Sequence, residues 1–490
     1  MILSELIKDL DCISINGGNT GCEVKGVTND TREAGQGWAF VAVTGCGNDG
    51  RQYIGRAIEA GACAIIGEGL DTYMEACSDS VCWIEVEDSR LAVATVADRF
   101  YDHPSGKLKL VGITGTNGKT TTVTLLYNLF RSLGYKCGLL STIANYVGDK
   151  RLETANTTSD PVTINRLLNE MQECGCSYCF MEVSSIGIEQ KRISGLEFAA
   201  GLFSNLTHDH LDYHGTFAEY LRCKKLFFDN LGSDAIAIVN VDDRNGRVMV
   251  QNCAARTVTT SCRSLADHSC RIIEESFDGM LLRIDGVEMW TRLIGAHNAY
   301  NLLAAYSLAV EFGYTPEDIL TALSALGAAP GRLEVMHGPK ELSVVIDYAH
   351  TPDALENVLH TLKDIEPGKP LICLFGCGGD RDRTKRPEMA RVAEKYSDRI
   401  FVTSDNSRTE KTADILEDIR KGFSPKGLAR ALFIEDRKEA IRAAITLAPD
   451  GAVVLLAGKG HETYQIIGTE HRHFDEREIA GEVFNTMKEL

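Results

Sequence analysis

The sequence predicts an α/β protein of three domains with mainly parallel sheets. Its 490 residues suffice for about three domains of about 150 residues each. An apolar strand, a glycine-rich turn and an amphipathic helix follow one another at residues 108–130, and strands alternate with helices through the last third. This alternation is typical of βαβ units, in which consecutive strands run parallel.

Two short Pro/Gly segments divide the chain between periodic elements. One covers residues 103–107 and precedes the strand that leads into the glycine-rich turn, and the other covers residues 328–332. Such segments mark turns and linkers. We therefore expect an N-terminal domain at 1–105, a central domain at 106–330 and a C-terminal domain at 331–490.

The net charge and the first residues exclude several classes of protein. A formal charge of −18 argues against nucleic acid or an anionic membrane as the main partner, because both require a basic surface. Charged residues at Glu5, Lys8 and Asp9 argue against a secretory signal, and no uncharged apolar run of about 18 residues is present. We expect a cytoplasmic location, with local clusters of Lys, Arg and backbone N–H groups holding anionic ligands.

The sixteen cysteines are scattered, with one tight cluster at Cys174, Cys176 and Cys179. This cluster is compatible with a metal site, but it falls between a predicted helix and strand, and no second pair is nearby in the sequence. Reduced, mostly buried thiols are the favoured interpretation.

The glycine-rich turn has the chemistry of a phosphate-binding loop. A strand, a glycine turn and a helix N-terminus direct backbone N–H groups and the helix dipole at phosphate oxygens, a lysine adds a point charge, and a threonine hydroxyl can bind Mg²⁺. Ile113 occupies the place of the usual first glycine, so the working core is shorter; an incidental glycine turn is the alternative. The expected ATP-binding residues are Gly115, Thr116, Asn117, Gly118, Lys119, Thr120 and Thr121.

Two further segments of the central domain could hold a divalent cation. Glu182 ends a predicted strand, and His210 lies in a run with three histidines and two aspartates, residues 205–214. Mg²⁺ is favoured because an ATP site already needs it. Surface imidazoles are the alternative for the histidines, and zinc is less favoured because no second protein ligand set is evident.

A predicted helix at residues 217–228 directs Lys224 towards an apolar face. Burial disfavours the charged form of lysine, and a neutral amine can react with CO₂ to form a carbamate, an anionic group that can approach Mg²⁺. On the residues alone, a snorkelling lysine or a buried ion pair is the stronger interpretation.

In the C-terminal domain, four predicted strands run directly into polar or glycine-rich residues. The strands are expected at 343–346, 371–375, 400–403 and 452–456, and the polar runs at 347–350, 376–382, 404–408 and 458–462. Ligands of open α/β sheets bind beyond the carboxyl ends of the strands. We therefore expect these four runs to form one cleft.

Together these segments resemble the Mur ligases of peptidoglycan synthesis, most closely the type that adds the third peptide residue. The resemblance covers nearly the whole chain and rests on residues 114–121, 181–185 and 209–214. It implies that Lys119 binds ATP phosphates, that Asn298 approaches the adenine, and that Arg332 and Asp347 contact ATP. It also implies a Mg²⁺ site at Thr120, Glu182, His210 and a carbamylated Lys224.

The resemblance further implies two substrate sites. The UDP-N-acetylmuramoyl-dipeptide would be held by Asn29, Thr31, Asn156, Thr157, Thr158, Ser184, Gln190 and Arg192. The incoming amino acid would be held by Arg381, Asp405, Asn406, Arg408, Gly458 and Glu462. The N-terminal, central and C-terminal domains would then bind the uridine nucleotide, ATP and the amino acid, respectively.

The implied reaction is ATP-dependent ligation of meso-diaminopimelate to the D-glutamate of the dipeptide through an acyl phosphate, with the chain acting as a monomer. Arg408 favours diaminopimelate over lysine, because a guanidinium pairs with its distal carboxylate and repels an ammonium. The alternatives are a lysine-adding ligase and a folylpolyglutamate-type ligase. Ile186 and Ser407 depart from the family pattern, which leaves a non-ligating nucleotide-binding regulator as a further alternative.

Overall fold

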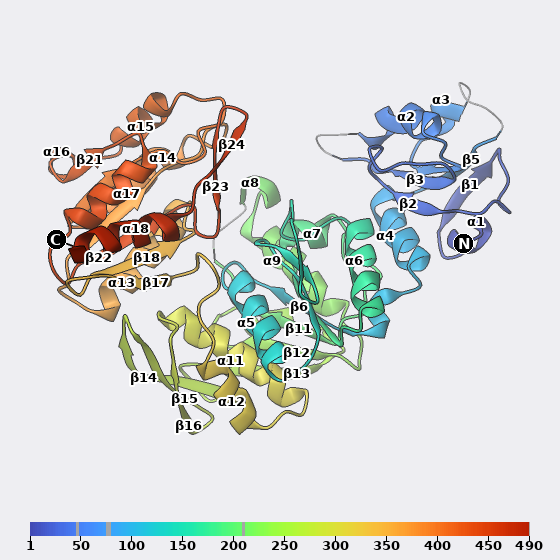
Figure 1. Ribbon diagram of the computed structural model, residues 1–490. Coiled ribbons are helices and arrows are strands. Elements are labelled where there is room, and N and C mark those ends of the chain that lie inside the picture. The colour runs from blue at the N-terminus through green and yellow to red at the C-terminus, as the bar shows by residue number, and fades with distance from the viewer. Residues whose placement is uncertain (46–48, 75–79, 208–210, 490) are drawn as a thin grey trace. The chain divides into compact units, whose positions relative to one another are not determined.

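The computed structural model describes residues 1–45, 49–74, 80–207 and 211–489 and is of mixed α/β class with mainly parallel sheets, as predicted (Figure 1). Its contacts divide the chain into two compact units. The first contains Met1–Ser269 and Asn301–Ile319, and the second contains Cys270–Tyr300 and Leu320–Leu490. The predicted boundaries near 105 and 330 stay predictions.

The N-terminal part of the first unit is a sheet in the order β1-β5-β4-β3-β2. Strands β2 to β5 run parallel, and β1 pairs antiparallel with β5 at one edge. Helix α4 (Ser89–Phe100) packs on this sheet, and the Asp88 side chain caps its first turn by accepting from the Leu91 N–H. The bounds are β1 Cys12–Asn16, β2 Gly26–Thr28, β3 Trp38–Ala42, β4 Ala64–Gly67, β5 Cys82–Val86, α1 Leu3–Leu6, α2 Ile54–Glu59 and α3 Asp71–Met74.

The central part of the first unit is a parallel sheet in the order β13-β12-β11-β6-β10-β7, to which β8 and β9 add an antiparallel edge. Strand β6 lies in its middle, so the turn that follows it leaves the sheet among other strand ends. The bounds are β6 Lys109–Thr114, β7 Cys137–Leu140, β8 Asn145–Val147, β9 Lys150–Leu152, β10 Tyr178–Glu182, β11 Ala200–Phe203, β12 Ile236–Asn240 and β13 Arg256–Ser261.

Helices α5, α6 and α9 cover this parallel sheet (Figure 1). Gly112 of β6 shows how closely α9 approaches it, because a Cβ there would lie 2.6 Å from the ring of Phe227. The apolar face predicted for residues 217–228 is confirmed: Tyr220, Cys223 and Phe228 are buried with Phe227. The bounds are α5 Lys119–Ser132, α6 Pro161–Glu173, α7 Ser185–Glu189, α8 Leu211–His214, α9 Phe217–Asp229 and α10 Gly246–Met249.

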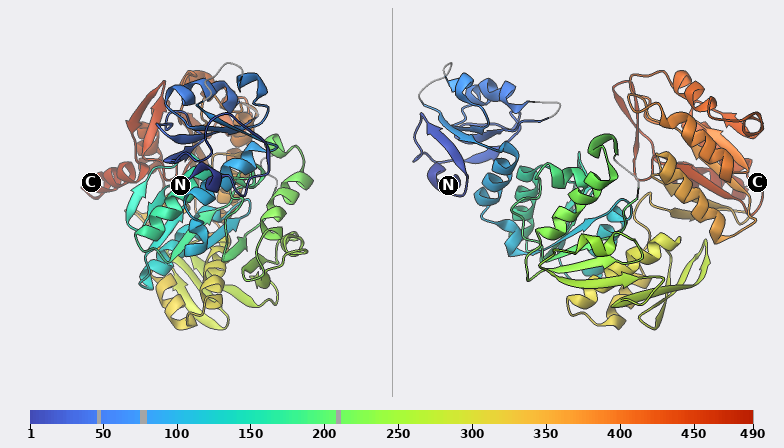
Figure 2. Two further views of the ribbon diagram at one scale, coloured as in Figure 1. Left: turned by 90° about the vertical axis from the view of Figure 1, so that its right-hand side faces the viewer. Right: turned by 180° about the vertical axis from the view of Figure 1, so that it is seen from behind.

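The second unit contains an antiparallel meander, β14 to β16, and a sheet in the order β17-β18-β22-β19-β20-β21 (Figure 2). All four strands predicted in the C-terminal third are present and parallel, and β17 pairs antiparallel with β18. The bounds are β14 His268–Ser276, β15 Gly279–Ile284, β16 Val287–Thr291, β17 Glu334–His337, β18 Ser343–Asp347, β19 Leu371–Phe375, β20 Arg399–Val402, β21 Ala431–Phe433 and β22 Val453–Ala457.

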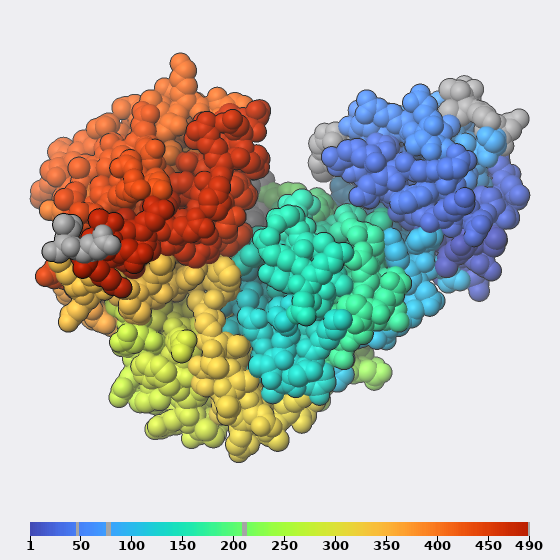
Figure 3. Space-filling view, viewed as in Figure 1, coloured from blue at the N-terminus to red at the C-terminus, as the bar shows by residue number. Residues whose placement is uncertain are grey.

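Helices and one hairpin complete the second unit. The hairpin pairs β23 (Tyr464–Ile467) with β24 (Glu470–His473), and the last turn of α18 lies at the surface (Figure 3). The helix bounds are α11 Ala296–Glu311, which begins in this unit and ends in the first, α12 Pro316–Ser324, which begins in the first unit and ends in this one, α13 Pro352–Ile365, α14 Lys385–Tyr396, α15 Thr412–Arg420, α16 Pro425–Leu428, α17 Arg437–Thr446 and α18 Glu476–Glu489.

Two glycines bring distant segments of the second unit into backbone contact. A Cβ on Gly331 would lie 2.0 Å from the carbonyl carbon of Gly460, and both residues have positive φ, +64° and +51°. Only glycine fits such an approach at such backbone angles. The segment before β17 therefore lies directly against the loop that follows β22.

Candidate active site

The turn between β6 and α5 has the backbone geometry of a phosphate-binding loop. Gly115 and Gly118 have φ of +148° and +88°, in the region that glycine adopts readily. A Cβ on Gly115 would lie 2.0 Å from Ser204 Oγ, and one on Gly118 would lie 2.5 Å from Asn301 Oδ1. Both glycines are therefore required by their neighbours as well as by their φ angles.

The loop is braced by the end of β11, through contacts that the sequence did not predict. The Thr116 N–H donates to the Asn205 carbonyl at 2.8 Å, and the Asn117 N–H donates to Asn205 Oδ1 at 3.0 Å. Asn205 Nδ2 in turn donates to the Asn117 carbonyl at 3.2 Å. Asn205 thus fixes the loop from 88 residues away, which local sequence patterns cannot reveal.

Two lysines direct their ammonium groups at the loop. Lys119 Nζ donates to the carbonyls of Gly115 and Thr116, at 2.9 and 2.7 Å. Lys224 Nζ donates to the same Gly115 carbonyl at 2.9 Å. The ammonium group of Lys119 at this glycine turn favours an anionic ligand there.

Glu182, at the end of β10, links the loop to the rest of the site. Its side chain is buried, Oε2 accepts from the Thr120 hydroxyl at 3.0 Å, and Oε1 accepts from the Thr142 N–H at 2.8 Å. Two oxygen donors beside a phosphate loop suit Mg²⁺, which prefers hard oxygen ligands. His210, the other predicted ligand, lies outside the described residues.

Lys224 is buried as predicted, with 1% of its surface exposed. Its Nζ lies 4.7 Å from the centre of the Tyr220 ring, and the Tyr220 hydroxyl lies 3.1 Å from Thr116 Oγ1. Helix α9 therefore contacts the phosphate loop through both side chains. The predicted carbamate stays a prediction.

Four of the predicted UDP-substrate residues form one hydrogen-bonded group next to Glu182: Thr158, Ser184, Gln190 and Arg192. Thr158 Oγ1 donates to the Glu182 carbonyl at 2.8 Å and accepts from the Ser184 N–H at 3.0 Å. Arg192 donates to the Thr158 carbonyl at 2.5 Å and to Gln190 Oε1 at 2.7 Å. These two acceptors are neutral, so neither of them balances the positive charge of the half-buried Arg192 guanidinium. That charge can therefore attract an anionic ligand.

The remaining UDP-substrate residues lie in two places. Thr157 Oγ1 accepts from the Thr142 hydroxyl at 3.0 Å, and Asn156 precedes it, so both adjoin the Glu182 group. Asn29 and Thr31 lie in the turn that follows β2, in the N-terminal sheet. No hydrogen bond within the described ranges joins that turn to Thr158 or its partners.

Three further residues predicted to approach ATP, Asn298, Arg332 and Asp347, lie in the second unit. Asn298 is buried in α11 and donates to the Ile294 carbonyl at 2.7 Å. Asp347 ends β18 and accepts from the N–H groups of Leu333 and Ala349, both at 2.8 Å. Burial raises the pKa of Asp347, although the Arg332 charge offsets part of that rise. The Nε of Arg332 is buried with no hydrogen-bond partner in the described structure, while its guanidinium lies 4.9 Å from the Tyr348 ring centre.

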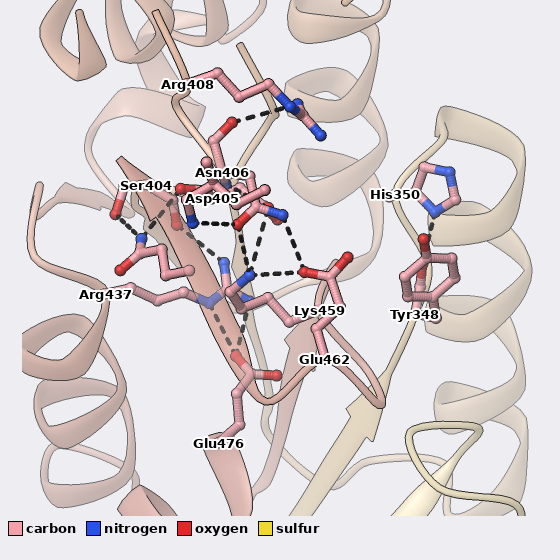
Figure 4. Close-up of polar contacts among 12 residues, drawn as sticks. Tyr348, His350, Ser404, Asp405, Asn406, Arg408, Arg437, Lys459, Glu462 and Glu476 are labelled. Carbon is pink, nitrogen blue, oxygen red and sulfur yellow. Dashed lines mark hydrogen bonds and ion pairs between the residues drawn. The ribbon is translucent and has the colours of Figure 1, made fainter. Parts of the chain in front are cut away.

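Four of the six predicted amino-acid residues lie together at the carboxyl ends of β20 and β22, and Figure 4 labels three of them, Asp405, Asn406 and Glu462. Asn406 Nδ2 donates to Glu462 Oε2 at 3.0 Å. Gly458 has φ +115°, and a Cβ there would lie 2.8 Å from Asp405 Oδ2. Two of the four strand ends expected to form one cleft, those of β20 and β22, therefore lie together, and the cleft itself stays a prediction.

Arg408 and Arg381 both lie close to Gly378. Arg408 Nη1 donates to the Gly379 carbonyl at 2.8 Å, and a Cβ on Gly378 would lie 3.1 Å from that nitrogen and 3.8 Å from Arg381 Cγ. Arg408 itself has φ +50°, a conformation that a non-glycine residue adopts only where its surroundings impose it. Two arginines on one glycine turn favour a carboxylate ligand.

Lys459 belongs to this cluster, and sequence reasoning passed over it. It is completely buried, and its Nζ donates to Asn406 Oδ1 and Glu462 Oε2, at 3.1 and 2.8 Å. The signal available in the sequence is a lysine between Gly458 and Gly460, directly after an apolar strand.

The cysteines follow the favoured interpretation, since every cysteine of the described residues is a free thiol. Cys174 and Cys176 have their sulfurs 3.5 Å apart, at the end of α6. Within the described part of the chain, no group of three or more His, Cys, Asp or Glu side chains could hold a metal ion. Nor does any described helix have the length and apolar character needed to cross a membrane.

Comparison with known proteins assigns all three parts of the chain to one family. Residues 23–101 match the Mur ligase family catalytic domain, residues 113–309 the Mur ligase middle domain, and residues 331–460 the Mur ligase glutamate ligase domain. A relative from Cytophaga hutchinsonii, named UDP-N-acetylmuramoyl-L-alanyl-D-glutamate--2,6-diaminopimelate ligase, is 48% identical over 487 residues, which cover 99% of this chain and 100% of the relative.

Two further matches agree with that relative. A protein of the same name from Bacteroides thetaiotaomicron is 48% identical, over 99% of this chain and 100% of its own length. A solved structure of a ligase of that name is 30% identical, with a TM-score of 0.70, and the match covers 100% of this chain and 99% of that one.

Proposed function

The chain belongs to the Mur ligase family, and we propose that it joins meso-diaminopimelate to the D-glutamate of UDP-N-acetylmuramoyl-L-Ala-D-Glu. It is an ATP-dependent, amide-forming ligase of peptidoglycan precursor synthesis. Two relatives that are 48% identical to this chain, and that match it over their whole length, are named for that reaction.

One observation supports this function above the others: Glu182 joins two sites. Its carboxylate accepts from Thr120 of the phosphate loop, while its main-chain carbonyl accepts from Thr158 of the Arg192 group. A triphosphate on the loop and an anionic acceptor beside Arg192 would therefore meet across a single residue. Such proximity is what transfer of a phosphoryl group to a carboxylate requires.

The proposed reaction proceeds in two steps. The side-chain carboxylate of D-glutamate attacks the γ-phosphorus of ATP, a new O–P bond forms, and the bond to ADP breaks. The amine of diaminopimelate then attacks the acyl carbon, phosphate leaves with the C–O bond electrons, and the nitrogen loses a proton. Lys119 and the loop N–H groups stabilise charge that develops on the transferred phosphoryl group.

We propose that Thr120, Glu182, His210 and a carbamylated Lys224 hold Mg²⁺. Among the described residues, the oxygen atoms Thr120 Oγ1 and Glu182 Oε2 suit this ion, and a carbamate on Lys224 would add a third oxygen ligand. When bound, Mg²⁺ neutralises negative charge on the nucleotide phosphates. The carbamate forms when the Lys224 amine bonds to the carbon of CO₂ and releases a proton, and its negative charge would complement the ion.

The amino-acid end of the site suits a zwitterion that also carries a distal carboxylate. Arg408 and Arg381 provide positive charge for carboxylate oxygens, and Glu462 provides negative charge for an ammonium group. Arg408 is therefore the residue that would disfavour lysine. We propose a cytoplasmic monomer, and the acidic net charge argues against a nucleic-acid partner or an anionic membrane.

A coupled assay of phosphate release, with identification of the product by mass, tests this proposal. We expect release that requires ATP, the UDP-muramoyl-dipeptide and meso-diaminopimelate together. Lysine, or glutamate with a folate acceptor, should give no product. Incorporation of lysine at a comparable rate would indicate a lysine-adding ligase, and no product with any acceptor would indicate a regulator that does not ligate.

A further inference from the structure

Lys459 is a buried cation whose partners are residues of the amino-acid site. It lies between Gly458 and Gly460, and none of its surface is exposed. Besides its bonds to Asn406 and Glu462, its Nζ lies 3.8 Å from Asp405 Oδ1 (Figure 4). A lysine ammonium has three donors and no acceptor, so it fixes the polarity of each group that it contacts.

The first consequence concerns the amide of Asn406. Its Oδ1 accepts from Lys459 and from the Ile466 N–H at 2.9 Å, so the oxygen must occupy that side of the amide. The nitrogen therefore lies on the other side and donates to Glu462 Oε2. The second N–H of that nitrogen has no partner among the described residues. Asn406 thus offers a donor, which suits a ligand carboxylate and opposes a ligand ammonium.

The second consequence concerns Glu462. Lys459 and Asn406 both donate to its Oε2, and no described residue donates to its Oε1. The protein therefore holds the carboxylate through Oε2, and Oε1 is the atom that can face a ligand. A carboxylate held through Oε2 can receive a ligand ammonium at Oε1.

The third consequence is the charge balance of the cluster. Asp405 and Glu462 both lie within 4 Å of Lys459, at 3.8 and 2.8 Å. Burial raises the pKa of Asp405, but the charges of Lys459, Arg437 and His350, together with the Asn406 N–H, lower it below its ordinary value. Without Lys459, two carboxylates and an amide oxygen would face one another with little compensation.

Resting on the proposed function, we infer that Lys459 is a positioning residue for the incoming amino acid: it orients Asn406 as a donor and Glu462 as an acceptor. Lys459 is buried and touches no ligand itself. It acts through these two side chains, which receive the carboxylate and the ammonium of one amino-acid centre.

Steady-state kinetics of Lys459→Met test this inference. Methionine keeps an unbranched apolar side chain, one atom shorter than that of lysine, and removes the ammonium group with its charge and its donors. The KM for meso-diaminopimelate should rise about tenfold or more, whereas kcat and the KM values for ATP and the UDP-dipeptide should stay within about threefold. Lys395→Met is the matched control, because that exposed lysine pairs with Glu356 on a helix surface, at 2.7 Å.

A double variant separates positioning from folding. Removing one partner of a buried ion pair destabilises a protein, whereas removing both is better tolerated. Lys459→Met/Glu462→Gln should therefore have a Tm close to that of wild type. Its KM for diaminopimelate should nevertheless exceed that of Glu462→Gln alone, because Asn406 has lost the donor that fixes its amide.

The results of these measurements distinguish the inference from its alternatives. Equal KM values for Glu462→Gln and the double variant, or a change of less than twofold in Lys459→Met, would overturn the inference. A parallel loss of kcat and of affinity for all three substrates would assign Lys459 a general structural role instead. Wild-type protein that fails to use diaminopimelate would refute the proposed function, a result independent of either variant.

Discussion

Glu182 and Thr120 lie within hydrogen-bond distance, 3.0 Å, although 62 residues separate them in the chain. Glu182 ends β10 and Thr120 lies in the first turn of α5, so the contact connects two adjacent strands at their carboxyl ends. Because the same glutamate also accepts from Thr142 and Thr158, it anchors the centre of the first unit's site.

Glu182→Gln should lower kcat by about 10²–10³-fold and shift the Mg²⁺ dependence to higher concentrations. Glutamine keeps the shape but only one of the two acceptors that Thr120 and the Thr142 N–H use, and it removes the charge that favours a divalent cation. The measurement is activity across a Mg²⁺ titration, with the exposed Glu173→Gln as the control. An unchanged Mg²⁺ dependence would exclude Glu182 as a ligand.

Lys224→Ala should lose nearly all activity, and short carboxylic acids should partly restore it by filling the place of a carbamate. The neighbouring Lys225 is the matched control, because it lies on the same helix and pairs with Asp229 instead. Lys225→Ala should stay active and should not respond to the acids. Full activity in Lys224→Ala would remove that residue from the mechanism.

Arg408→Asn should reduce selectivity for diaminopimelate over lysine. Asparagine tolerates the positive φ of this position, so the change isolates the loss of the guanidinium. A charge-assisted contact of about 3 kcal/mol corresponds to a loss in kcat/KM for diaminopimelate of about 100-fold, with little change for lysine. Arg399→Asn, on the surface of β20, controls for general effects of losing an arginine. Equal losses for both amino acids would contradict the assignment.

Gly118→Ala should destabilise the protein more than Gly134→Ala. Both glycines have φ near +90°, and a left-handed non-glycine residue costs about 1–2 kcal/mol. A Cβ at Gly134 meets nothing within 4 Å, whereas one at Gly118 would lie 2.5 Å from Asn301 Oδ1. Thermal unfolding of the two variants measures the difference, and the KM for ATP should rise only in Gly118→Ala. Equal Tm values would mean that the loop relaxes freely.

Glu410→Gln should lower the Tm at neutral pH, and the difference from wild type should narrow in acid. Hydrogen bonds from Arg386 and Arg383, together with the Asp380 N–H, lower the pKa of Glu410 from 4.5 to about 2. A carboxyl with a lowered pKa stabilises the fold above its unfolded value and loses this contribution as the pH falls. The difference in Tm between wild type and Glu410→Gln should therefore disappear as the pH falls from 4.5 to 2. A constant gap would show that the charge of Glu410 is unimportant.

Much of the fold could be predicted because its elements depend on local patterns. The period of apolar residues after Lys119 predicted α5, and apolar runs ending in polar residues predicted β18, β19, β20 and β22. The burial of Lys224 followed from its helical face. In each case the deciding information lies within about ten consecutive residues.

The rest depends on which segments meet. Asn205 braces the phosphate loop only because β11 pairs with β6, and Lys459 contacts Asn406 only because β22 and β20 flank β19. The antiparallel edges, β8 with β9 and the meander β14 to β16, were likewise not predicted. Pairing of distant strands is a property of the whole chain, which single-sequence patterns do not encode.

The crossing of Gly331 and Gly460 gives the amino-acid site a mechanical constraint. Because their backbones lie in close contact, a displacement of the segment before β17 would press on the loop that carries Lys459 and Glu462. Anything that pulls on the chain before β17 would be felt at the place where the third substrate binds. The segment before β17 and the loop of the amino-acid site are therefore expected to move together.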